Sequence, residues 1–366
     1  MPISATITRR KFHQTNALLL ASTLWPTQLP TIQAKTVQKR KIKIGQIGTE
    51  HGHASKISVY RKSADYEVVG IVDRNPTPNQ QTRSHPAFRD LNWMSTEQLL
   101  NHPDLDAVLI ETDVHSSLEF AELCINAGKH IHLDKPAGES LPNFERILNA
   151  AKEKKLLIQM GYMYRFNPAW LLLKQLYSSG AIGDIFEVQA VMSKVISAAD
   201  RKALSTYPGG TMFELGCHLI DLVVDLLGYP SAITPYALHS GPQQDQLIDN
   251  MLAVFQYPKA TATIKSSALE VEGFARRHLT VCGTKGTVHI QPLDQPKITL
   301  SLDSQTDGYQ KGIQEITFPK PFERYVSDAE DMAKILRGEA DSRWSYAHDL
   351  QVQRAVLLAS NLTVAN

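Results

Sequence analysis

A strand, a turn, a helix, a second strand and an acid follow one another between residues 41 and 73, and this order constrains the fold most. Residues 41–47 and 66–72 have the apolar, β-branched character of buried strands. Gly48 follows the first strand, a helix is expected to begin near His53, and Asp73 ends the second strand. The pattern predicts a mononucleotide-binding unit, in which the loop holds phosphate and the acid contacts a ribose hydroxyl.

The remaining chain changes character near residue 161. Before it, apolar runs at 105–110, 130–133 and 156–160 alternate with helices expected over 117–127 and 141–155, as a parallel sheet requires. After it, runs at 185–192, 251–257, 260–266, 278–282 and 287–290 have β character with turn residues between them, and 344–362 is an amphipathic helix. We therefore predict an α/β protein: a Rossmann domain with a doubly wound parallel sheet over 37–160, and a C-terminal α+β domain with a large, mostly antiparallel open sheet over 161–366.

Composition excludes several classes of protein. The 366 residues carry a formal net charge of +1 with acids and bases interspersed, which argues against nucleic acid as a partner. Three widely spaced cysteines cannot all pair in a disulfide framework, and we expect them to be buried apolar residues. The sequence contains neither a phosphate loop of the Gly-x-x-x-x-Gly-Lys type nor a Gly-x-Ser-x-Gly elbow.

The first 36 residues are expected to lie outside the fold. Arg9 and Arg10 form a twin-arginine pattern, and an uncharged stretch at 17–25 precedes Pro26. This layout predicts an export signal and linker, and hence a periplasmic bacterial protein, or a membrane-tethered one if the signal stays uncleaved. The stretch is too short to span a bilayer, and a tail that happens to contain two arginines is the alternative.

Two separated motifs carry the candidate chemistry. Lys135 follows the apolar run 128–133, and Glu214 and His218 stand at helical i, i+4 spacing, so both project from one face. A lysine and a histidine brought together over a nucleotide-binding sheet are what reversible alcohol oxidation requires. His218 is the candidate general base, because a neutral imidazole accepts a hydroxyl proton near neutral pH, and Glu214 would orient its ring. The alternatives are a surface lysine that closes a turn and a core histidine.

The chain resembles the Gfo/Idh/MocA family, the glucose-fructose oxidoreductase and inositol dehydrogenase superfamily, from about residue 41 onward. The motifs that carry this resemblance are 128–136 (GKHIHLDKP), 161–168 (GYMYRFNP), 180–183 (GAIG), Gly209-Gly210 through Glu214, His218 and Asp221, and 283–286 (GTKG). The resemblance implies an N-terminal Rossmann domain, a C-terminal domain with a large open sheet and a bound nicotinamide cofactor. It also implies carbohydrate-like substrates such as sugars or polyols, and a homo-oligomer.

The resemblance also implies roles for individual residues. Lys135 matches the family's catalytic lysine, which contacts both the cofactor and the reacting oxygen, while Glu214 stands where aspartate is usual. Tyr162 and Arg165 are expected to line the substrate side, with an interdomain salt bridge as the alternative for Arg165. For Asp221, substrate contact and capping of polar backbone remain equal alternatives. The residues expected at the cofactor are Gly48, Thr49, His51, Gly52, Asp73, Arg74, Thr112 and Lys135.

The cofactor loop departs from the family pattern. Glu50 and His53 replace the second and third glycines of the dinucleotide fingerprint, and Glu50 would bring negative charge toward phosphate unless its side chain turns away. Gly52 restores flexibility one position late. Asp73 keeps the acid expected at the ribose, whereas Arg74 would suit a 2′-phosphate. We therefore expect NAD or NADP, with NAD favoured. Asp113 and Ser117 stand where proline and histidine are usual, so this edge of the nicotinamide pocket also differs.

A metal site is not expected from the sequence. His51-Gly-His53 and His130-Ile-His132 each offer two imidazoles, but neither pair has an obvious third ligand in the sequence.

Three functions follow from these motifs. The first is an NAD(P)-dependent oxidoreductase that transfers hydride to or from a carbinol carbon, with Lys135 polarising the oxygen and His218 as acid or base. The second is a glycoside hydrolase that uses NAD for transient oxidation. The third is a non-catalytic carbohydrate-binding protein with a degraded cofactor loop.

Overall fold

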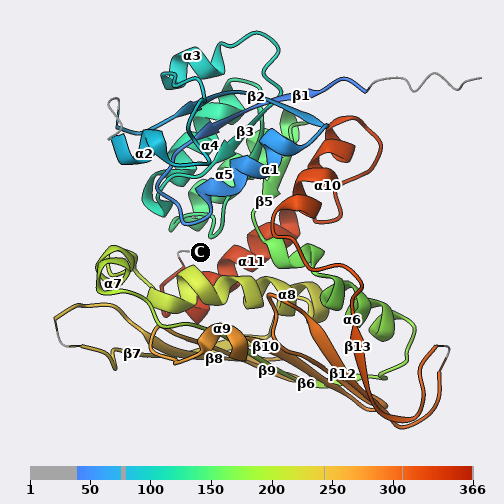
Figure 1. The fold of residues 1–366 in the computed structure, drawn as a ribbon. Helices are drawn as coiled ribbons and strands as arrows, with labels where there is room; N and C mark the ends of the chain where they lie inside the picture. Colours follow the sequence, from blue (N-terminus) through green and yellow to red (C-terminus); the bar gives the residue numbers. More distant parts are fainter. Residues whose placement is uncertain (1–38, 76–79, 243, 307, 365–366) are drawn as a thin grey trace, which may run out of the picture. The chain divides into compact units, whose positions relative to one another are not determined.

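The computed structural model describes residues 39–75, 80–242, 244–306 and 308–364, and Arg40–Asn366 form one compact unit (Figure 1). The predicted twin-arginine segment, residues 1–36, lies outside the described residues. No helix in the described part of the chain is long and apolar enough to cross a bilayer.

The N-terminal part is a five-stranded parallel sheet of order β2-β1-β3-β4-β5. Its strands are β1 (Ile42–Ile47), β2 (Tyr66–Val72), β3 (Ala107–Ile110), β4 (His130–Leu133) and β5 (Ile158–Met160). Its helices are η1 (Ala54–Lys56), α1 (Ile57–Lys62), α2 (Gln80–Ser84), α3 (Thr96–Leu100), α4 (Val114–Asn126) and α5 (Leu141–Glu153). The predicted doubly wound parallel sheet is therefore confirmed.

These strands are buried because helices cover both faces of the sheet, as parallel sheets require. All four residues of β3 are buried. The apolar stripe of α5, which includes Phe144 and Ile147, packs with α4 into the main core. Helix α4 begins three residues earlier than the sequence predicted, because the Asp113 carboxylate accepts the Ser116 amide and caps the helix.

The C-terminal part is an eight-stranded sheet of order β13-β12-β11-β10-β6-β9-β8-β7. Its strands are β6 (Ile185–Ser193), β7 (Ala232–Leu238), β8 (Asn250–Gln256), β9 (Thr261–Ser267), β10 (His278–Gly283), β11 (Gly286–Ile290), β12 (Lys297–Leu302) and β13 (Gly312–Thr317). Every pairing is antiparallel except β6 with β9. The predicted large, mostly antiparallel sheet is confirmed, and Figure 1 shows helices α6, α8 and α11 lying along one of its faces.

The helices of this part are η2 (Met163–Phe166), α6 (Pro168–Ser178), α7 (Ala198–Leu204), η3 (Met212–Gly216), α8 (Cys217–Leu227), α9 (Gly273–Arg276), α10 (Val326–Leu336) and α11 (Tyr346–Ala359). Alternation along β8 points Met251, Ala253 and Phe255 into the core beneath them. Cys124 and Cys217 are buried free thiols, and Cys282 is half-buried.

Helix α10 lies far along the chain yet packs against the N-terminal sheet. Ala329, Met332 and Ala333 belong to the same buried cluster as Ile42 and Ile44. The Tyr66 hydroxyl also donates to the Ala329 carbonyl at 2.6 Å. The sequence-based domain boundaries at 37–160 and 161–366 stay predictions, and α10 spatially accompanies the first of these regions.

Candidate functional site

The loop after β1 turns at Gly48, where only glycine fits. Gly48 has φ +98°, and a Cβ there would lie 2.4 Å from the Thr112 amide nitrogen. Its own amide donates to the Val72 carbonyl at 2.8 Å. The Gly48 position therefore holds the ends of β1, β2 and β3 together at the edge where parallel sheets bind ligands.

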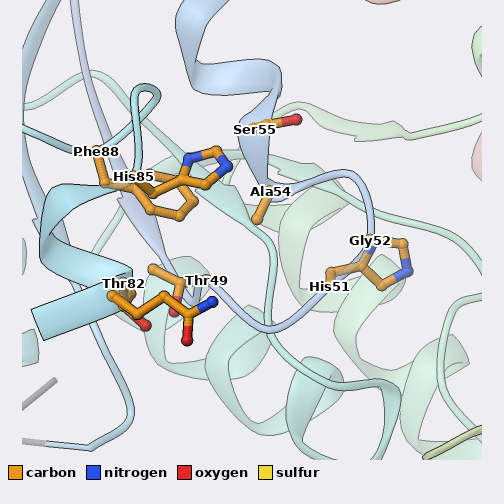
Figure 2. Close-up of a pocket in the computed structure, with 9 residues that line it drawn as sticks. Thr49, His51, Gly52, Ala54, Ser55, Thr82, His85 and Phe88 are labelled. Carbon is orange, nitrogen blue, oxygen red and sulfur yellow. The ribbon is translucent and has the colours of Figure 1, made fainter. Parts of the chain in front are cut away.

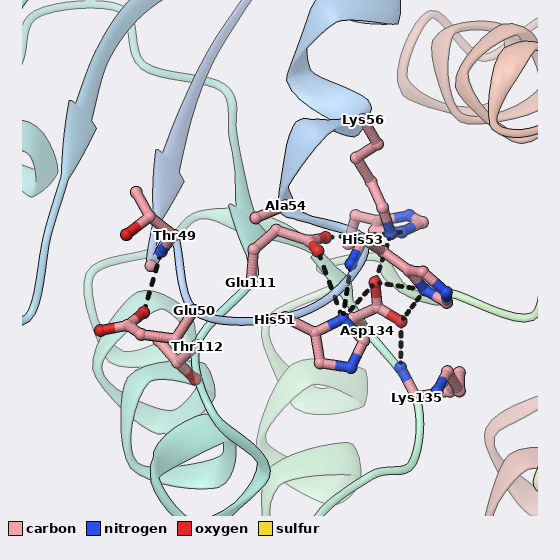
Figure 3. Close-up of polar contacts among 12 residues, drawn as sticks. Thr49, Glu50, His51, His53, Ala54, Lys56, Glu111, Thr112, Asp134 and Lys135 are labelled. Atoms are coloured by element: carbon pink, nitrogen blue, oxygen red, sulfur yellow. Dashed lines mark hydrogen bonds and ion pairs between the residues drawn. The ribbon is translucent and has the colours of Figure 1, made fainter. Parts of the chain in front are cut away.

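Residues of the loop bind Asp73 after β2 and the backbone of the loop itself at this edge. The Thr49 hydroxyl donates to Asp73 Oδ2 at 2.7 Å, and the Asn75 amide donates to Asp73 Oδ1 at 2.8 Å. Glu50 turns back so that its Oε2 accepts the Thr49 amide at 2.9 Å (Figure 3). The Glu50 carboxylate therefore accepts the hydrogen bond of a loop amide that would otherwise donate to a phosphate oxygen. This contact exists because glutamate replaces the second glycine of the fingerprint.

Two cavities flank the loop. The first, of about 290 Å³, is lined by Thr49, His51, Gly52, His85 and Phe88 among others (Figure 2). The second, of about 530 Å³, is bounded by Asp73, Arg74, Asn75, Trp93 and Met94 among others. Open space surrounds the position that a Cβ of Gly52 would take. The loop, the acid and the adjoining cavities fit a dinucleotide.

Thr112, another expected cofactor residue, lies just before α4, and Arg74, which follows β2, contacts the residue that caps this helix. The buried Thr112 donates its hydroxyl to the Asp113 carbonyl at 3.0 Å. Arg74 Nη1 pairs with Asp113 Oδ2 at 2.6 Å, and the Arg74 side chain is 59% exposed. Part of the positive charge of Arg74 is thus engaged by Asp113, which stands where the family usually has proline.

Asp134, directly after β4, is the centre of a buried polar cluster (Figure 3). Its Oδ1 accepts the Lys135 amide, and its Oδ2 accepts Lys56 Nζ, each at 2.6 Å. His53 Nδ1 lies 3.2 Å from Oδ1, and His51 Nδ1 lies 3.4 Å from Oδ2. Burial alone would raise the pKa of Asp134, but His51 and Lys56 hold it well below its usual range. Asp134 is therefore a carboxylate.

Lys56 lies beneath this cluster, fully buried. Its Nζ is 2.9 Å from both His132 Nε2 and Glu111 Oε1. Burial would lower the pKa of Lys56, but Asp134 and Glu111 raise it, so the amine stays protonated. Burial and the neighbouring Asp134 raise the pKa of Glu111 well above its usual range. Burial, followed by Lys56, lowers the pKa of His132 to about 3.

Lys135 reaches across to the C-terminal part of the chain. Its Nζ donates to the carbonyl oxygen and to Oε1 of Glu214, each at 2.8 Å. Glu214 lies in η3, a π-helical turn that runs directly into α8 and widens the helix at this point. Burial would lower the pKa of Lys135, but Glu214 raises it. Lys135 is thus a buried ammonium group that Glu214 holds in place.

His218, at the start of α8, faces the same region. The ring is buried, and its Nδ1 has no hydrogen-bond partner among the residues that the structure describes. Its centroid lies 6.0 Å from that of His53 and 5.2 Å from that of Tyr164. Burial and then the charge of Lys135 lower the pKa of His218 well below its usual range. A neutral imidazole with a free ring nitrogen therefore lies within the field of the Lys135 ammonium.

The residues expected on the substrate side form an ion cluster instead of an open surface. Arg165 Nη2 pairs with Asp221 Oδ1 at 2.6 Å and with Asp349 Oδ1 at 2.7 Å, and all three residues are buried. The Arg165 guanidinium lies 5.0 Å from the centre of the Tyr162 ring. The cluster ties η2 to α8 and α11, so the salt bridges of Arg165 lie within the predicted region 161–366 and are not the interdomain bridge of the alternative. Substrate contacts by Tyr162, Arg165 and Asp221 stay predictions.

Sequence reasoning missed three residues of the cluster around Asp134. Lys56 and Glu111 carry no motif, since one lies in a short helix and the other ends a buried strand. Asp134 belongs to a recognisable motif, but its contact with His51 and His53 depends on β1 and β4 ending at the same edge of the sheet. The signal was nevertheless present in the sequence. Two histidines follow one predicted strand and an acid follows another, and a parallel sheet brings the carboxyl ends of its strands to one edge.

The fold and this site define a class of protein, one with a dinucleotide-binding sheet and a lysine and a histidine at its ligand-binding edge. A family model described as the oxidoreductase family with an NAD-binding Rossmann fold matches residues 42–162, and the GFO/IDH/MocA C-terminal domain matches residues 170–289. The chain belongs to the GFO/IDH/MocA oxidoreductase family. These matches confirm the resemblance seen in the sequence and the prediction of an NAD(P)-dependent oxidoreductase.

Curated relatives share about a quarter of the aligned residues. The uncharacterized oxidoreductase YhhX of Escherichia coli is 26% identical over 247 residues, 66% of this chain and 68% of YhhX. The scyllo-inositol 2-dehydrogenase (NADP⁺) IolW of Bacillus subtilis is 26% identical over 219 residues, 59% of this chain and 58% of IolW. The trans-1,2-dihydrobenzene-1,2-diol dehydrogenase of Xenopus tropicalis is 23% identical over 62% of this chain and 68% of that enzyme.

Solved structures share the fold at lower identity. The UDP-N-acetylglucosamine 3-dehydrogenase GnnA of Acidithiobacillus ferrooxidans superposes with a TM-score of 0.73 at 18% identity, covering 88% of this chain and 98% of GnnA. An NAD-binding oxidoreductase of Klebsiella pneumoniae gives 0.71 at 18% identity, covering 86% of this chain and 95% of that chain.

Proposed function

We propose that the protein transfers hydride between a nicotinamide dinucleotide and a carbinol carbon of a sugar, a polyol or a related compound. One observation carries the proposal: the Lys135 ammonium donates to Glu214 in the turn that runs directly into α8, and the ring of His218 at the start of α8 lies 6.0 Å from that of His53 in the cofactor loop. An alcohol oxidation needs a cation at the reacting oxygen and a base for its proton.

The dinucleotide would be held by the loop of Gly48, Thr49 and Gly52 and by Asp73. When bound, the nicotinamide ring supplies the hydride acceptor or donor. We propose NAD as the preferred cofactor, because the Asp73 carboxylate would repel a 2′-phosphate and contact a ribose hydroxyl instead. Arg74 does not offset this preference, because it already pairs with Asp113 at 2.6 Å.

The chain's own residues divide the remaining work. Lys135 stabilises negative charge on the reacting oxygen, and the low-dielectric surroundings strengthen that interaction. His218 is neutral, so Nδ1 accepts the hydroxyl proton during oxidation and returns it during reduction. Glu214 is a positioning residue in this scheme, since it fixes Lys135 through two hydrogen bonds and keeps it protonated.

The substrate class follows from the relatives. IolW, the Xenopus enzyme and GnnA are named as dehydrogenases of scyllo-inositol, of a vicinal diol and of an N-acetylglucosamine nucleotide. Each name describes oxidation of a secondary alcohol in a ring that carries further oxygen or nitrogen substituents. This shared chemistry supports a carbohydrate-like substrate for the present chain.

The experiment measures reduced-cofactor absorbance for the purified protein with NAD⁺ or NADP⁺ and a panel of inositols, hexoses and amino sugars. We expect turnover with NAD⁺, and a loss of at least about 100-fold in His218→Asn, the size of a general-base contribution. The matched control is Lys152→Met, because Lys152 is exposed on α5. Near-normal turnover in His218→Asn would exclude the proposed role of the imidazole.

Two other outcomes would replace this proposal. Release of the aryl group from nitrophenyl glycosides without net NADH accumulation would indicate a glycoside hydrolase that works by transient oxidation. Carbohydrate binding without binding of either dinucleotide would indicate a non-catalytic member of the family.

We also propose that the protein is exported through the twin-arginine route. The support is the sequence around Arg9 and Arg10 and the apolar stretch after it. Cell fractionation of the wild-type chain and of the Arg9→Lys/Arg10→Lys variant tests this proposal. A periplasmic wild type and a retained variant are expected, and equal distributions would contradict it.

A further inference from the structure

Three side chains with metal-binding atoms meet at the ends of β1 and β4. His51 and His53 come from the cofactor loop, and Asp134 follows β4. One ligand atom of each lies within 4.8 Å of the others, and the side chains converge in Figure 3. The two imidazoles are separated by one residue, and the carboxylate reaches them because parallel strands end at one edge of the sheet.

The distances within this group suit coordination of one ion. Nδ1 of His53 lies 3.2 Å from Asp134 Oδ1, the oxygen that would bind the ion, and Nδ1 of His51 lies 3.4 Å from Oδ2 of the same carboxylate. In a tetrahedral site with bonds of about 2.0–2.1 Å, neighbouring ligand atoms stand about 3.3–3.4 Å apart. Small side-chain rotations would complete the geometry. The 3.2 Å hydrogen bond from the His53 amide to His51 Nδ1 must lengthen, and the hydrogen bond between His53 Nδ1 and Asp134 is replaced by the metal bonds.

A buried, unpartnered atom supplies the second observation. His51 is 9% exposed, and its Nε2 has no hydrogen-bond partner in the part of the chain that the structure describes. This nitrogen lies 3.8 Å from Glu214 Oε1. A histidine that binds a metal through one ring nitrogen usually directs the other N–H at a carboxylate. The place of Glu214 beside His51 matches that arrangement.

Asp134 keeps one carboxylate oxygen for an ion. Its Oδ2 is engaged by the Lys56 ammonium at 2.6 Å, so Oδ1 is the oxygen available to an ion, since a carboxylate oxygen bonded to one amide keeps a second lone pair.

We propose that His51, His53 and Asp134 bind one divalent transition-metal ion of the zinc class. Two imidazoles and one carboxylate favour Zn²⁺, Co²⁺ or Fe²⁺ over Mg²⁺ and Ca²⁺, which prefer oxygen ligands. Three protein ligands leave at least one coordination position open, as in catalytic zinc sites. The ion would fix the cofactor loop against the end of β4, and metal binding can be measured without the hydride reaction.

The test uses the full chain, stripped with a chelator, incubated with Zn²⁺ or Co²⁺ and desalted. We expect about one zinc ion per chain by elemental analysis, a visible absorption spectrum of the Co²⁺ form, and a higher unfolding temperature with Zn²⁺ than after chelation. His53→Gln should lose zinc and the Co²⁺ spectrum, whereas the control His102→Gln, on a loop remote from the cluster, should keep both.

A further variant guards against a folding defect in His53→Gln. His53→Cys replaces one ligand by another, so its Co²⁺ form should gain a sulfur-to-cobalt charge-transfer band in the near ultraviolet, with a native circular dichroism spectrum. Zinc far below one ion per chain in the reconstituted wild type would overturn the proposal. So would equal zinc in the wild type and a folded His53→Gln, because such zinc would be adventitious.

Discussion

Replacing Lys135 separates its contribution to stability from its contribution to chemistry. Lys135→Met leaves the Glu214 carboxylate, whose side chain is 15% exposed, without the ammonium 2.8 Å from Oε1. Removing one partner of a buried ion pair costs about 3–5 kcal/mol of unfolding free energy. Because Glu214 keeps some contact with solvent, we expect the lower end of this range, about 3 kcal/mol.

The double variant Lys135→Met/Glu214→Gln provides the comparison. Removing both charges of a buried pair is often close to neutral, so we expect stability within about 1 kcal/mol of the wild type. Turnover should stay at background in both variants, because neither has a cation at the reacting oxygen. Urea unfolding followed by tryptophan fluorescence gives the stabilities, and cofactor absorbance gives the rates.

Two results would refute this reasoning. A double variant that turns over at a near-wild-type rate would show that the ammonium of Lys135 does not act on the substrate. A loss of less than about 0.5 kcal/mol in Lys135→Met would show that the pair with Glu214 behaves as an exposed surface ion pair.

Three more substitutions test other parts of the structure. Gly48→Ala should destabilise the fold by about 2 kcal/mol or more and abolish NADH binding, since the alanine Cβ would lie 2.4 Å from a backbone nitrogen. An unchanged urea unfolding curve would contradict this prediction. Arg165→Met should cost about 3–5 kcal/mol in the same assay, because the buried carboxylates of Asp221 and Asp349 would lose the guanidinium that they share. A smaller loss would mean that the cluster is open to water. Burial raises the pKa of Asp328 from 3.8 to about 6, so its stabilising contribution is present below pH 3.8 and is lost as the pH rises through 6. Asp328→Asn should therefore be more stable than the wild type at pH 8, by up to about 3 kcal/mol, and should have the same stability as the wild type near pH 4. If the variant and the wild type were equally stable at both pH values, Asp328 would not carry a buried charge at pH 8.

The fold was predictable because the buried strands are local in sequence. Residues 41–47 and 66–72 have the apolar character of parallel strands because helices cover both faces, and alternation in β8 and β9 reveals one buried face. The ends of elements were less predictable. Helix α4 begins at Val114 because the Asp113 side chain caps it, and the π-helical turn at Met212–Gly216 begins without a side-chain cap that could mark it in the sequence.

The candidate site was predictable only where a motif carried it. Lys135 and His218 belong to motifs, whereas the surroundings that set their protonation come from long-range contacts. The i, i+4 spacing predicts that Glu214 orients His218, but in the structure Glu214 binds Lys135. Lys56 contacts Asp134 across 78 positions of sequence, so no spacing rule indicates that pair.

The same limit applies to the metal-binding group. The sequence shows two histidines and no third ligand, because Asp134 approaches them only when β1 and β4, with β3 between them, end at the same edge of the sheet. Such a group is a property of sheet topology, and local sequence patterns do not encode it.

The most direct test of the central claim is a fluorescence titration of the purified chain with NADH and with NADPH. The claim requires a working dinucleotide site despite Glu50 and His53, and Trp93, at the edge of the cavity beside Asp73, should report it by energy transfer to the reduced nicotinamide. We predict saturable binding of about one NADH per chain, tighter than NADPH and absent in Gly48→Ala. Failure of both dinucleotides to saturate the folded protein would contradict the account.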